Sequence, residues 1–465
     1  MKPSLSSIVV MAVIGTVSLS FMVIPPPDGL SQAGQRVLGI ATITIGLWGT
    51  KILPMGVTAM LLVVLLVLSE GVNDFQEALI GFAQPVPYFL IAVLTIGLAV
   101  KKCGLAERIA RFSLRQCRER PMALYTHLLI SMPLLTLLLP SATSRTGILV
   151  HVYEQSLSLS MVPKDAQLSK AIMMALNSIN RLASTIILTG GITPVVAAAL
   201  VGGISWSRWF VLLSIPYLTL LLLGSGLIYL IYRQGFTTQM ARVPDTLSGP
   251  LTKMEIRTIV ITLGASLLWL TDSIHHMNPA IPALMAWICL LAPWIGVLSW
   301  QDFEKNVGWT NFLVIASSMS LAGALIDSGA GSWLAELIIG SLPVLSQSPL
   351  IVAAVLLLAA IPVRLLIPNI TGFLAVAIPI AISIANLTGL NPLVCSLLVM
   401  IVGDSVLYYP AQSASSLVVY ERGYLSTIEI FWFGCLMTIM ACLVALFVAL
   451  PYWNLIGEPF VNMAQ

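Results

Sequence analysis

Charged residues are scarce in this 465-residue sequence: Asp, Glu, Lys and Arg make up 9% of it, against 58% hydrophobic residues. An average soluble protein carries about 25% charged residues. A chain this apolar lacks the polar groups that a water-exposed surface needs, so we predict an integral membrane protein. Its apolar runs are long and some contain Gly or Pro, which indicates spanning helices rather than the alternating strands of an outer-membrane barrel.

Cysteine pairs and enzyme motifs are also missing. The cysteines show no CxxC spacing, so we expect free packing thiols and neither disulfides nor a metal site. They are Cys103, Cys117, Cys289, Cys395, Cys435 and Cys442. The absence of HExxH, GxSxG, a P-loop lysine and paired aspartates in apolar runs argues against a membrane-embedded enzyme. The net charge of +3 and the lack of a basic tail give no reason to expect a nucleic-acid partner.

Several uninterrupted apolar runs approach the roughly 20 residues that cross a bilayer as a helix. The predicted spans are residues 7–24, 37–50, 52–69, 86–100, 208–232, 256–271, 280–298, 309–326 and 428–450. The first run follows Lys2 and is not closed by an A-x-A site. A retained first helix is therefore favoured over a cleaved signal peptide.

Lys and Arg collect on one side of these spans. The stretch KKCGLAERIARFSLRQCRERP at residues 101–121 is basic and has helical apolar spacing, which is typical of an amphipathic helix on the cytoplasmic surface. The connector 233–257 is also basic, whereas the connector 70–85 is acidic and has no Lys or Arg. Alternate spans counted from Lys2 predict about 11 crossings of the inner (cytoplasmic) membrane. The N-terminus is then cytoplasmic and the C-terminus external.

Four further apolar segments are interrupted by polar or helix-breaking residues. Segments 122–162 and 349–386 break near residues 143 and 370, and we interpret them as re-entrant hairpins. Segments 171–203 and 392–420 break near residues 191 and 410, and we interpret them as broken helices. Each half of the chain thus carries a hairpin and then a broken helix, in opposite orientations. This pattern is typical of an inverted-repeat transporter with its binding site at mid-membrane.

The predicted fold is therefore an all-α polytopic membrane protein built from two inverted repeats. Residues 1–36 form an N-terminal helix and an external loop, residues 37–240 the first repeat, and residues 241–465 the second. Each repeat supplies scaffold helices, one re-entrant hairpin and one broken helix.

The interruptions resemble the motifs of the divalent anion–sodium symporter family, whose members carry Ser-Asn-Thr at each hairpin tip. The first tip reads Ser141-Ala142-Thr143 and the second Pro368-Asn369-Ile370-Thr371. The broken helices carry Thr193-Pro194 and Pro410-Ala411, and residues 299–337 are similar to the family's segment of Trp, acidic residues and a small-residue-rich helix. Ala142 departs from the motif. In the second motif, Asn369 matches either the first or the central position.

The resemblance implies a secondary active transporter that moves small di- or tricarboxylates or a similar oxyanion by alternating access. It also implies a homodimer in the lipid bilayer, with coupling to Na⁺ or exchange of one anion for another. Losing a side-chain oxygen at Ala142 weakens a sodium site, since hard cations need several oxygen ligands. The alternatives are a membrane-embedded enzyme and a permease subunit of a larger complex.

The residues near the four breaks are the candidate site residues, because half-helix N-termini, hydroxyls and amides suit the oxygens of an anion. The expected substrate-binding residues are Ser141, Thr143, Ser144, Arg145, Thr193, Pro194, Asn369, Thr371, Pro410 and Gln412. The expected cation-binding residues are Ser141, Thr143, Gly190, Asn369, Thr371 and Asp404.

The embedded charges leave alternatives open. An arginine at mid-bilayer costs about 2.5–3.5 kcal/mol, which a carboxylate contact would offset. Arg145 either contacts the substrate or replaces a sodium ion, or else forms a structural ion pair or reaches a water-filled vestibule. Asp404 either pairs with Arg181 or Arg364 or serves as a proton- or cation-coupling carboxylate. Arg364 could also stand in for sodium.

Overall fold

The computed structural model describes residues 14–461, apart from 17, 19, 21–23, 51, 110–119, 140, 241–249, 342–347 and 368. Most of the predicted first span (7–24) and residues 110–119 of the predicted amphipathic helix at 101–121 lie outside the described residues. The described part is all helical, with one isolated bridge between Leu390 and Val461. The all-α class predicted from composition is confirmed.

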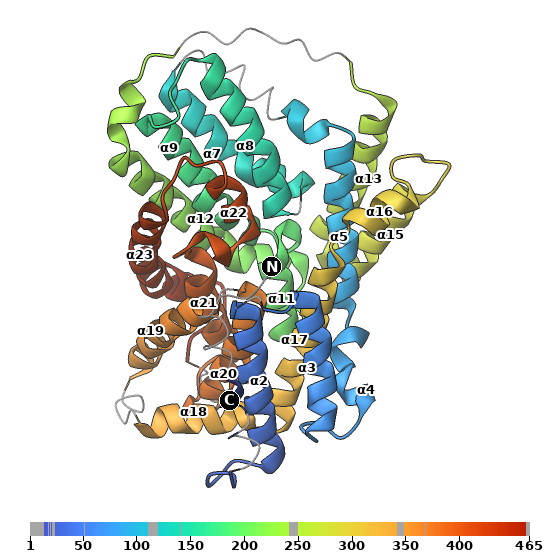
Figure 1. Ribbon diagram of the computed structural model, residues 1–465, viewed down its shortest axis with the longest axis vertical. Helices are drawn as coiled ribbons and strands as arrows, with labels where there is room; N and C mark the ends of the chain where they lie inside the picture. Colours follow the sequence, from blue (N-terminus) through green and yellow to red (C-terminus); the bar gives the residue numbers. More distant parts are fainter. Residues whose placement is uncertain are drawn as a thin grey trace.

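The helices follow one another along the chain with short connections (Figure 1). Those of residues 14–240 are α2 (Gln32–Thr50), α3 (Met55–Leu68), α4 (Phe75–Ala78), α5 (Pro85–Lys102), α7 (Pro121–Leu138), α8 (Ala142–Leu159), α9 (Gln167–Met174), α10 (Asn180–Thr185), α11 (Ile192–Leu200) and α12 (Trp206–Ile231). Those of residues 250–461 are α13 (Lys253–Leu270), α14 (Asp272–His275), α15 (Ala280–Leu291), α16 (Trp300–Asn306), α17 (Trp309–Asp327), α18 (Ala330–Ser341), α19 (Pro349–Leu366), α20 (Ile370–Thr388), α21 (Pro392–Ser405), α22 (Ala414–Tyr420), α23 (Thr427–Val444) and α24 (Leu450–Leu455).

Local chemistry explains many helix ends. Pro121, Pro349 and Pro392 occupy the first turns of α7, α19 and α21, where proline has no N–H to lose. The predicted span 280–298 is too long, because α15 ends at Leu291. Ala292, the residue before Pro293, is extended, as a residue preceding proline prefers to be.

Seven of the described helices are long and apolar enough to cross a membrane. They are Pro85–Lys102, Pro121–Leu138, Trp206–Ile231, Trp309–Asp327, Pro349–Leu366, Ile370–Thr388 and Thr427–Leu455, and Met55–Leu68, Ala280–Leu291 and Pro392–Ser405 are shorter apolar helices. The multi-pass prediction is confirmed to this extent. The five described cysteines are free, and Cys117 lies outside the described residues.

The two halves of the chain interlock. Helix α8 packs against α22, α12 against α23, α3 against α17, and α5 against α15, so each pair joins the first half of the chain to the second. In Figure 1, α5, α13, α15 and α16 lie on one side of the molecule, and α7, α8, α9, α12, α22 and α23 lie on the other. Helices α11 and α17 run between these groups.

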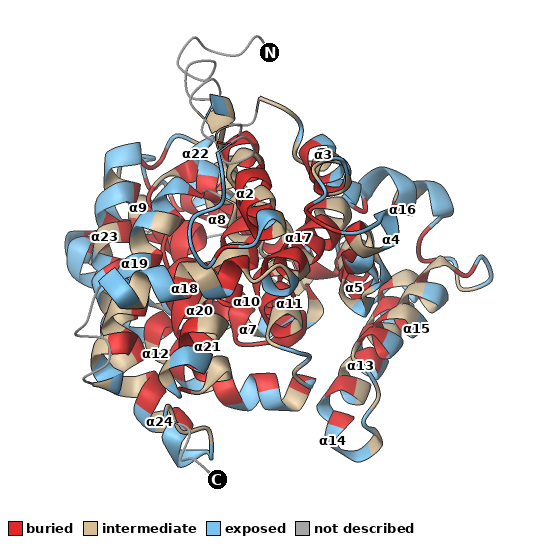
Figure 2. Cartoon of the chain, turned by 90° about the horizontal axis from the view of Figure 1, so that it is seen from below, coloured by how far each residue is buried: buried red, intermediate tan, exposed pale blue. Residues whose placement is uncertain are grey.

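The most deeply buried part of the molecule is its centre (Figure 2). Every residue of α10 is buried, and α21 is buried from Val394 to Ser405. The outward faces of α13, α19 and α23 are exposed and apolar, with Val260, Leu358 and Trp432 more than 60% exposed. Exposed apolar faces of this extent suit lipid contact.

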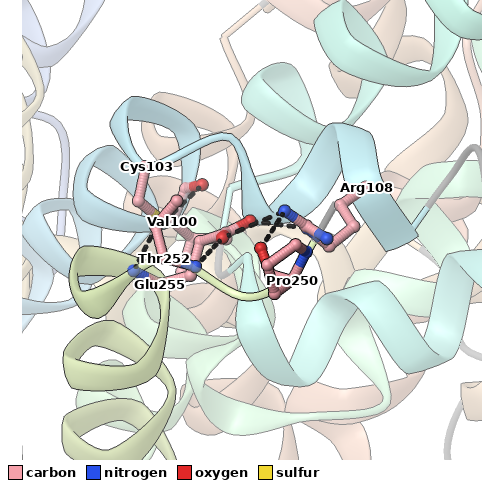
Figure 3. A network of polar contacts seen from close by, with 6 residues as sticks. All are labelled: Val100, Cys103, Arg108, Pro250, Thr252 and Glu255. Carbon is pink, nitrogen blue, oxygen red and sulfur yellow. Dashed lines mark hydrogen bonds and ion pairs between the residues drawn. The ribbon is translucent and has the colours of Figure 1, made fainter. Parts of the chain in front are cut away.

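A polar network fastens the segment after α5 to the start of α13 (Figure 3). Arg108 donates through Nε to Glu255 Oε1 at 2.7 Å, and through Nη2 to Glu255 Oε2 at 3.2 Å and the Pro250 carbonyl at 3.3 Å. Glu255 and Thr252 form a capping box at the α13 N-terminus. The network therefore joins residues of the first and second halves of the chain.

Candidate functional site

A polar N-cap residue lies at the tip of each hairpin. In the first hairpin (α7 and α8), Ser141 is the N-cap of α8 and accepts a hydrogen bond from the Ser144 N–H at 3.3 Å. In the second hairpin (α19 and α20), Asn369 is the N-cap of α20 and accepts from the Thr371 N–H at 3.2 Å. Ser and Asn are favoured N-caps because their side chains satisfy free helix N–H groups. Asn369-Ile370-Thr371 therefore corresponds directly to Ser141-Ala142-Thr143.

The broken helices are interrupted at the predicted places. Helix α10 ends at Thr185 and α11 begins at Ile192; α21 ends at Ser405 and α22 begins at Ala414. At the first break, a Cβ added to Gly190 would lie 2.1 Å from the Ser184 carbonyl oxygen, so only glycine fits there. Irregular backbone inside a membrane protein is tolerated where it is buried in protein or lines a cavity.

The tips and the breaks surround one cavity of about 500 Å³. The predicted site residues that line it are Ser141, Thr143, Ser144, Thr193, Pro194, Asn369, Thr371, Asp404 and Gln412. Three others, Arg145, Gly190 and Pro410, are not among its lining residues. Residues from all four interrupted segments thus meet in space, although they are spread over more than 270 positions of the sequence.

Arg145 is fully buried and is not among the residues that line the cavity. It donates through Nε to Asn180 Oδ1 at 3.2 Å and through Nη1 to the Leu139 carbonyl at 2.6 Å. Its Nη1 and Nη2 groups also reach the carbonyls of Gly190 and Asn180, at 3.4 and 3.3 Å, and Nη2 reaches the Ser184 hydroxyl. The side chain therefore joins the first hairpin to the first broken helix, and its position gives no support to the expected substrate contact.

Arg364 does the same in the second repeat. It is fully buried, and it donates through Nη1 to the Ile367 carbonyl at 2.7 Å and through Nε to the Gly403 carbonyl at 2.8 Å. Gln412 in turn donates to the Arg364 carbonyl at 3.1 Å. Each hairpin is thus tied to the broken helix of its own repeat by an arginine that binds the carbonyl just before the tip.

Asp404 is held by hydroxyl groups. Its Oδ1 accepts from Thr193 at 2.9 Å, and its Oδ2 accepts from Thr185 at 2.6 Å and from Tyr217 at 3.4 Å. The ion pair expected between Asp404 and an arginine is not formed by the Asp404 carboxylate. The neighbouring Arg181 donates instead to the main-chain carbonyl of Asp404. The carboxylate of the second repeat is bonded instead to the broken helix of the first.

Arg181 lies at the cavity and was not among the expected ligands. It is 8% exposed and its Nη2 donates to the carbonyls of Asp404 and Val406, at 3.2 Å in the latter case. Its Nε is buried and has no hydrogen-bond partner in the described part of the chain. Asn369 also keeps a buried amide nitrogen, Nδ2, that is bonded to none of the described residues.

The cavity reaches the surface at residues that sequence reasoning missed. Lys101, Asn306 and Thr310 line it and are exposed. They lie at the end of α5, the end of α16 and the start of α17. Nearby, Lys102 forms a 2.5 Å ion pair with Asp302. The hydrogen bonds from Lys102 and Ser299 hold the pKa of Asp302 below its usual range.

Comparison with known proteins gives a consistent result. Residues 4–458 match the family described as the sodium:sulfate symporter transmembrane region. The L-tartrate/succinate antiporter of Escherichia coli strain 536 is 24% identical over 382 residues, covering 78% of this chain and 77% of the relative. Dicarboxylate transporter 1 of Spinacia oleracea chloroplasts is 25% identical over 354 residues, covering 72% and 60%. The solved YdaH transporter of Alcanivorax borkumensis shares the fold, with a TM-score of 0.56, 17% identity, and coverage of 84% and 90%.

Proposed function

The chain belongs to the sodium:sulfate symporter family, and from that premise we propose that it is a secondary active transporter that exchanges small dicarboxylates across the cytoplasmic membrane. The family expected from the tip motifs is thus the right one. Membership makes the protein a membrane transporter and not an enzyme.

The observation that carries this proposal is the cavity enclosed by both hairpin tips and both helix breaks. Helices α8, α11 and α20 begin at its wall, so their free N–H groups and positive dipole ends favour a bound anion. Hydroxyls of Ser144 and Thr371 and the amide of Asn369 add neutral polar groups. A volume of about 500 Å³ lies within the usual range of roughly 300–1,000 Å³ for small-molecule sites.

Dicarboxylates are the favoured substrate class. Two relatives are named for tartrate, succinate or dicarboxylates in general. A dicarboxylate has an anionic group at each end, and the cavity has a hairpin tip from each repeat. Tricarboxylates and sulfate are tested as competing substrates below.

Exchange without sodium is favoured by Arg145 and Arg364. Each guanidinium binds the carbonyl just before a hairpin tip, Leu139 in one repeat and Ile367 in the other. Main-chain carbonyls at such positions are natural ligands for a coupling cation. In this protein the guanidinium groups of Arg145 and Arg364 occupy these two carbonyls. Ala142 supplies no side-chain oxygen for a cation. The anion site can therefore keep its positive surroundings without bound Na⁺.

The remaining features are proposed from the family resemblance and the charge pattern. They are a homodimer in the inner membrane, a cytoplasmic N-terminus and an external C-terminus. Two re-entrant hairpins and about 11 crossings complete the proposed topology.

Uptake into proteoliposomes tests the function. Purified protein should take up labelled succinate when the vesicles contain unlabelled dicarboxylate, and equally well in Na⁺ and K⁺ buffers. A panel of malate, tartrate, citrate and sulfate as internal anions defines the substrate class. Uptake that requires Na⁺ and no internal anion would refute exchange, and failure of the purified chain to move any anion would favour a permease subunit of a larger complex.

A further inference from the structure

We propose that Arg181 binds a carboxylate of the substrate and determines the preference of the site for a dianion, an inference that rests on the transport function proposed above. Arg181 is on α10, more than nine-tenths buried, and lines the cavity beside Thr193. It is therefore a cation placed where the substrate would lie.

The guanidinium of Arg181 has donors to spare. The group carries five N–H donors and no acceptor. Among the described residues, its bonds are made by Nη2 alone, to the carbonyls of Asp404 and Val406. Nε is buried, and neither Nε nor Nη1 is bonded to any of these residues. An unpartnered charged donor at a cavity is unfavourable when empty and is satisfied by an oxyanion.

Arg145 and Arg364, the buried arginines of the two hairpins, differ from Arg181 in their position relative to the cavity. Arg145 and Arg364 do not line the cavity, and they donate to main-chain carbonyls within their own repeats. Their charges act on the substrate only at a distance, because other residues line the cavity. Arg181 is the one of these three that can touch it.

A second donor lies on the opposite repeat. Asn369, the N-cap of α20, uses its side-chain oxygen within the tip and leaves Nδ2 buried without a described partner. Arg181 from the first repeat and Asn369 from the second therefore offer donors to the two ends of one ligand. A dicarboxylate matches this arrangement, whereas its monoester would leave one donor set without a charged acceptor.

Asp404 opposes Arg181 electrostatically. Its carboxylate lines the same cavity and is held by Thr185, Thr193 and Tyr217. A negative charge there weakens binding of a dianion more than binding of a monoanion. Removing the charge of Arg181 and removing the charge of Asp404 should therefore change selectivity in opposite directions.

The test is competition between succinate and monomethyl succinate for uptake of labelled succinate in proteoliposomes. In Arg181→Gln the ratio of the two inhibition constants should fall at least tenfold toward equal potency. A loss of folded protein would reduce uptake without changing this ratio. Arg422→Gln removes a cation that pairs with Glu154 near the surface, and it should leave the ratio unchanged.

Asp404→Asn gives an independent test, because asparagine keeps the shape and can still accept from Thr193. Its inhibition constant for succinate should fall, with a smaller change for the monoester. The proposal is overturned if Arg181→Gln, or Arg181→Met where the former does not fold, keeps the wild-type ratio. If wild-type protein exchanges no dicarboxylate, the proposed function itself fails.

Discussion

At the scale of single residues, the role of a buried charged side chain depends on the groups that surround it. Arg145, Arg181 and Arg364 are all buried in apolar helices, but they have different surroundings. Arg145 and Arg364 each join a hairpin to a broken helix, because they donate to main-chain carbonyls of both segments. Arg181 keeps free donors because it stands at the edge of the cavity.

Arg145 should therefore be needed for stability rather than for substrate contact. Replacing it with Ala leaves the carbonyls of Leu139, Asn180 and Gly190 without their donor. Each buried group left unsatisfied costs about 1–3 kcal/mol. We expect Arg145→Ala to lower the melting temperature of the purified protein by several degrees, with a smaller loss in Arg145→Lys.

Thermal unfolding of the detergent-purified variants measures this effect, with Arg422→Ala as the matched surface control. Arg145→Ala protein that melts like the wild type but binds no succinate would contradict the structural role. It would support the direct substrate contact that the sequence suggested.

At the scale of elements, the two hairpins are equivalent although their arginines are not. Arg145 lies on α8, after the first tip, whereas Arg364 lies on α19, before the second. Both nevertheless bind the carbonyl that ends the first helix of their hairpin and a carbonyl of the neighbouring broken helix. The carbonyls left free by a helix C-terminus attract a cation from whichever helix can reach them.

The ion pair between Arg108 and Glu255 is the element-scale contact with a clear pH dependence (Figure 3). Burial raises the pKa of Glu255, but hydrogen bonds from Thr252 and Arg108 outweigh it, so the pKa lies below its usual value. A lowered pKa in the folded protein means that the pair contributes its full stability above the unfolded-state pKa of about 4.3. That contribution is lost as pH falls through the lower folded-state pKa.

Glu255→Gln should therefore reduce stability by about 1.5–3 kcal/mol at pH 7, the range for a hydrogen bond to a charged group. The difference from wild type should shrink as the pH falls below 4. Melting curves at several pH values measure it, with the exposed Glu304→Gln as control. A difference that stays constant from pH 7 to pH 3 would show that the charge of Glu255 is not responsible.

At the scale of the whole molecule, exposed residues of the cavity lining predict the side from which substrate enters. Three of them, Lys101, Asn306 and Thr310, lie at the ends of helices for which the charge pattern predicts a cytoplasmic position. The α14 loop, with the exposed Ser273, lies at the other end of α13. The predicted orientation therefore predicts a conformation that admits substrate from the basic, cytoplasmic side.

Cysteine labelling tests this sidedness. In a background without native cysteines, Asn306→Cys and Thr143→Cys should react with a membrane-impermeant maleimide from the cytoplasmic side, and Ser273→Cys from the other side. Dicarboxylate should protect Thr143→Cys because that residue lines the cavity. Labelling of Asn306→Cys only from the external side would reverse the proposed orientation.

Whether a feature can be predicted from the sequence depends on how far apart along the chain the interacting residues lie. The helix breaks were predictable because Gly190, Pro194 and Pro410 act on their own neighbourhood. The correspondence of the tips was within reach too, since Pro140-Ser141 and Pro368-Asn369 align directly; the two prolines lie outside the described residues. The end of α15 was missed because the apolar run continues past Pro293, whereas the extended Ala292 before that proline ends the helix.

The sequence alone determined that this is a polytopic helical membrane protein of a dianion-transporter family, because composition, Gly and Pro positions and tip motifs are local properties of the chain. Only the tertiary structure decided that Arg181, and not Arg145, lines the cavity. Each arginine turns toward partners far away along the chain, Arg145 toward Asn180 and Gly190, and Arg181 toward Asp404 and Val406. No local pattern encodes such contacts, since the packing of the two repeats creates them.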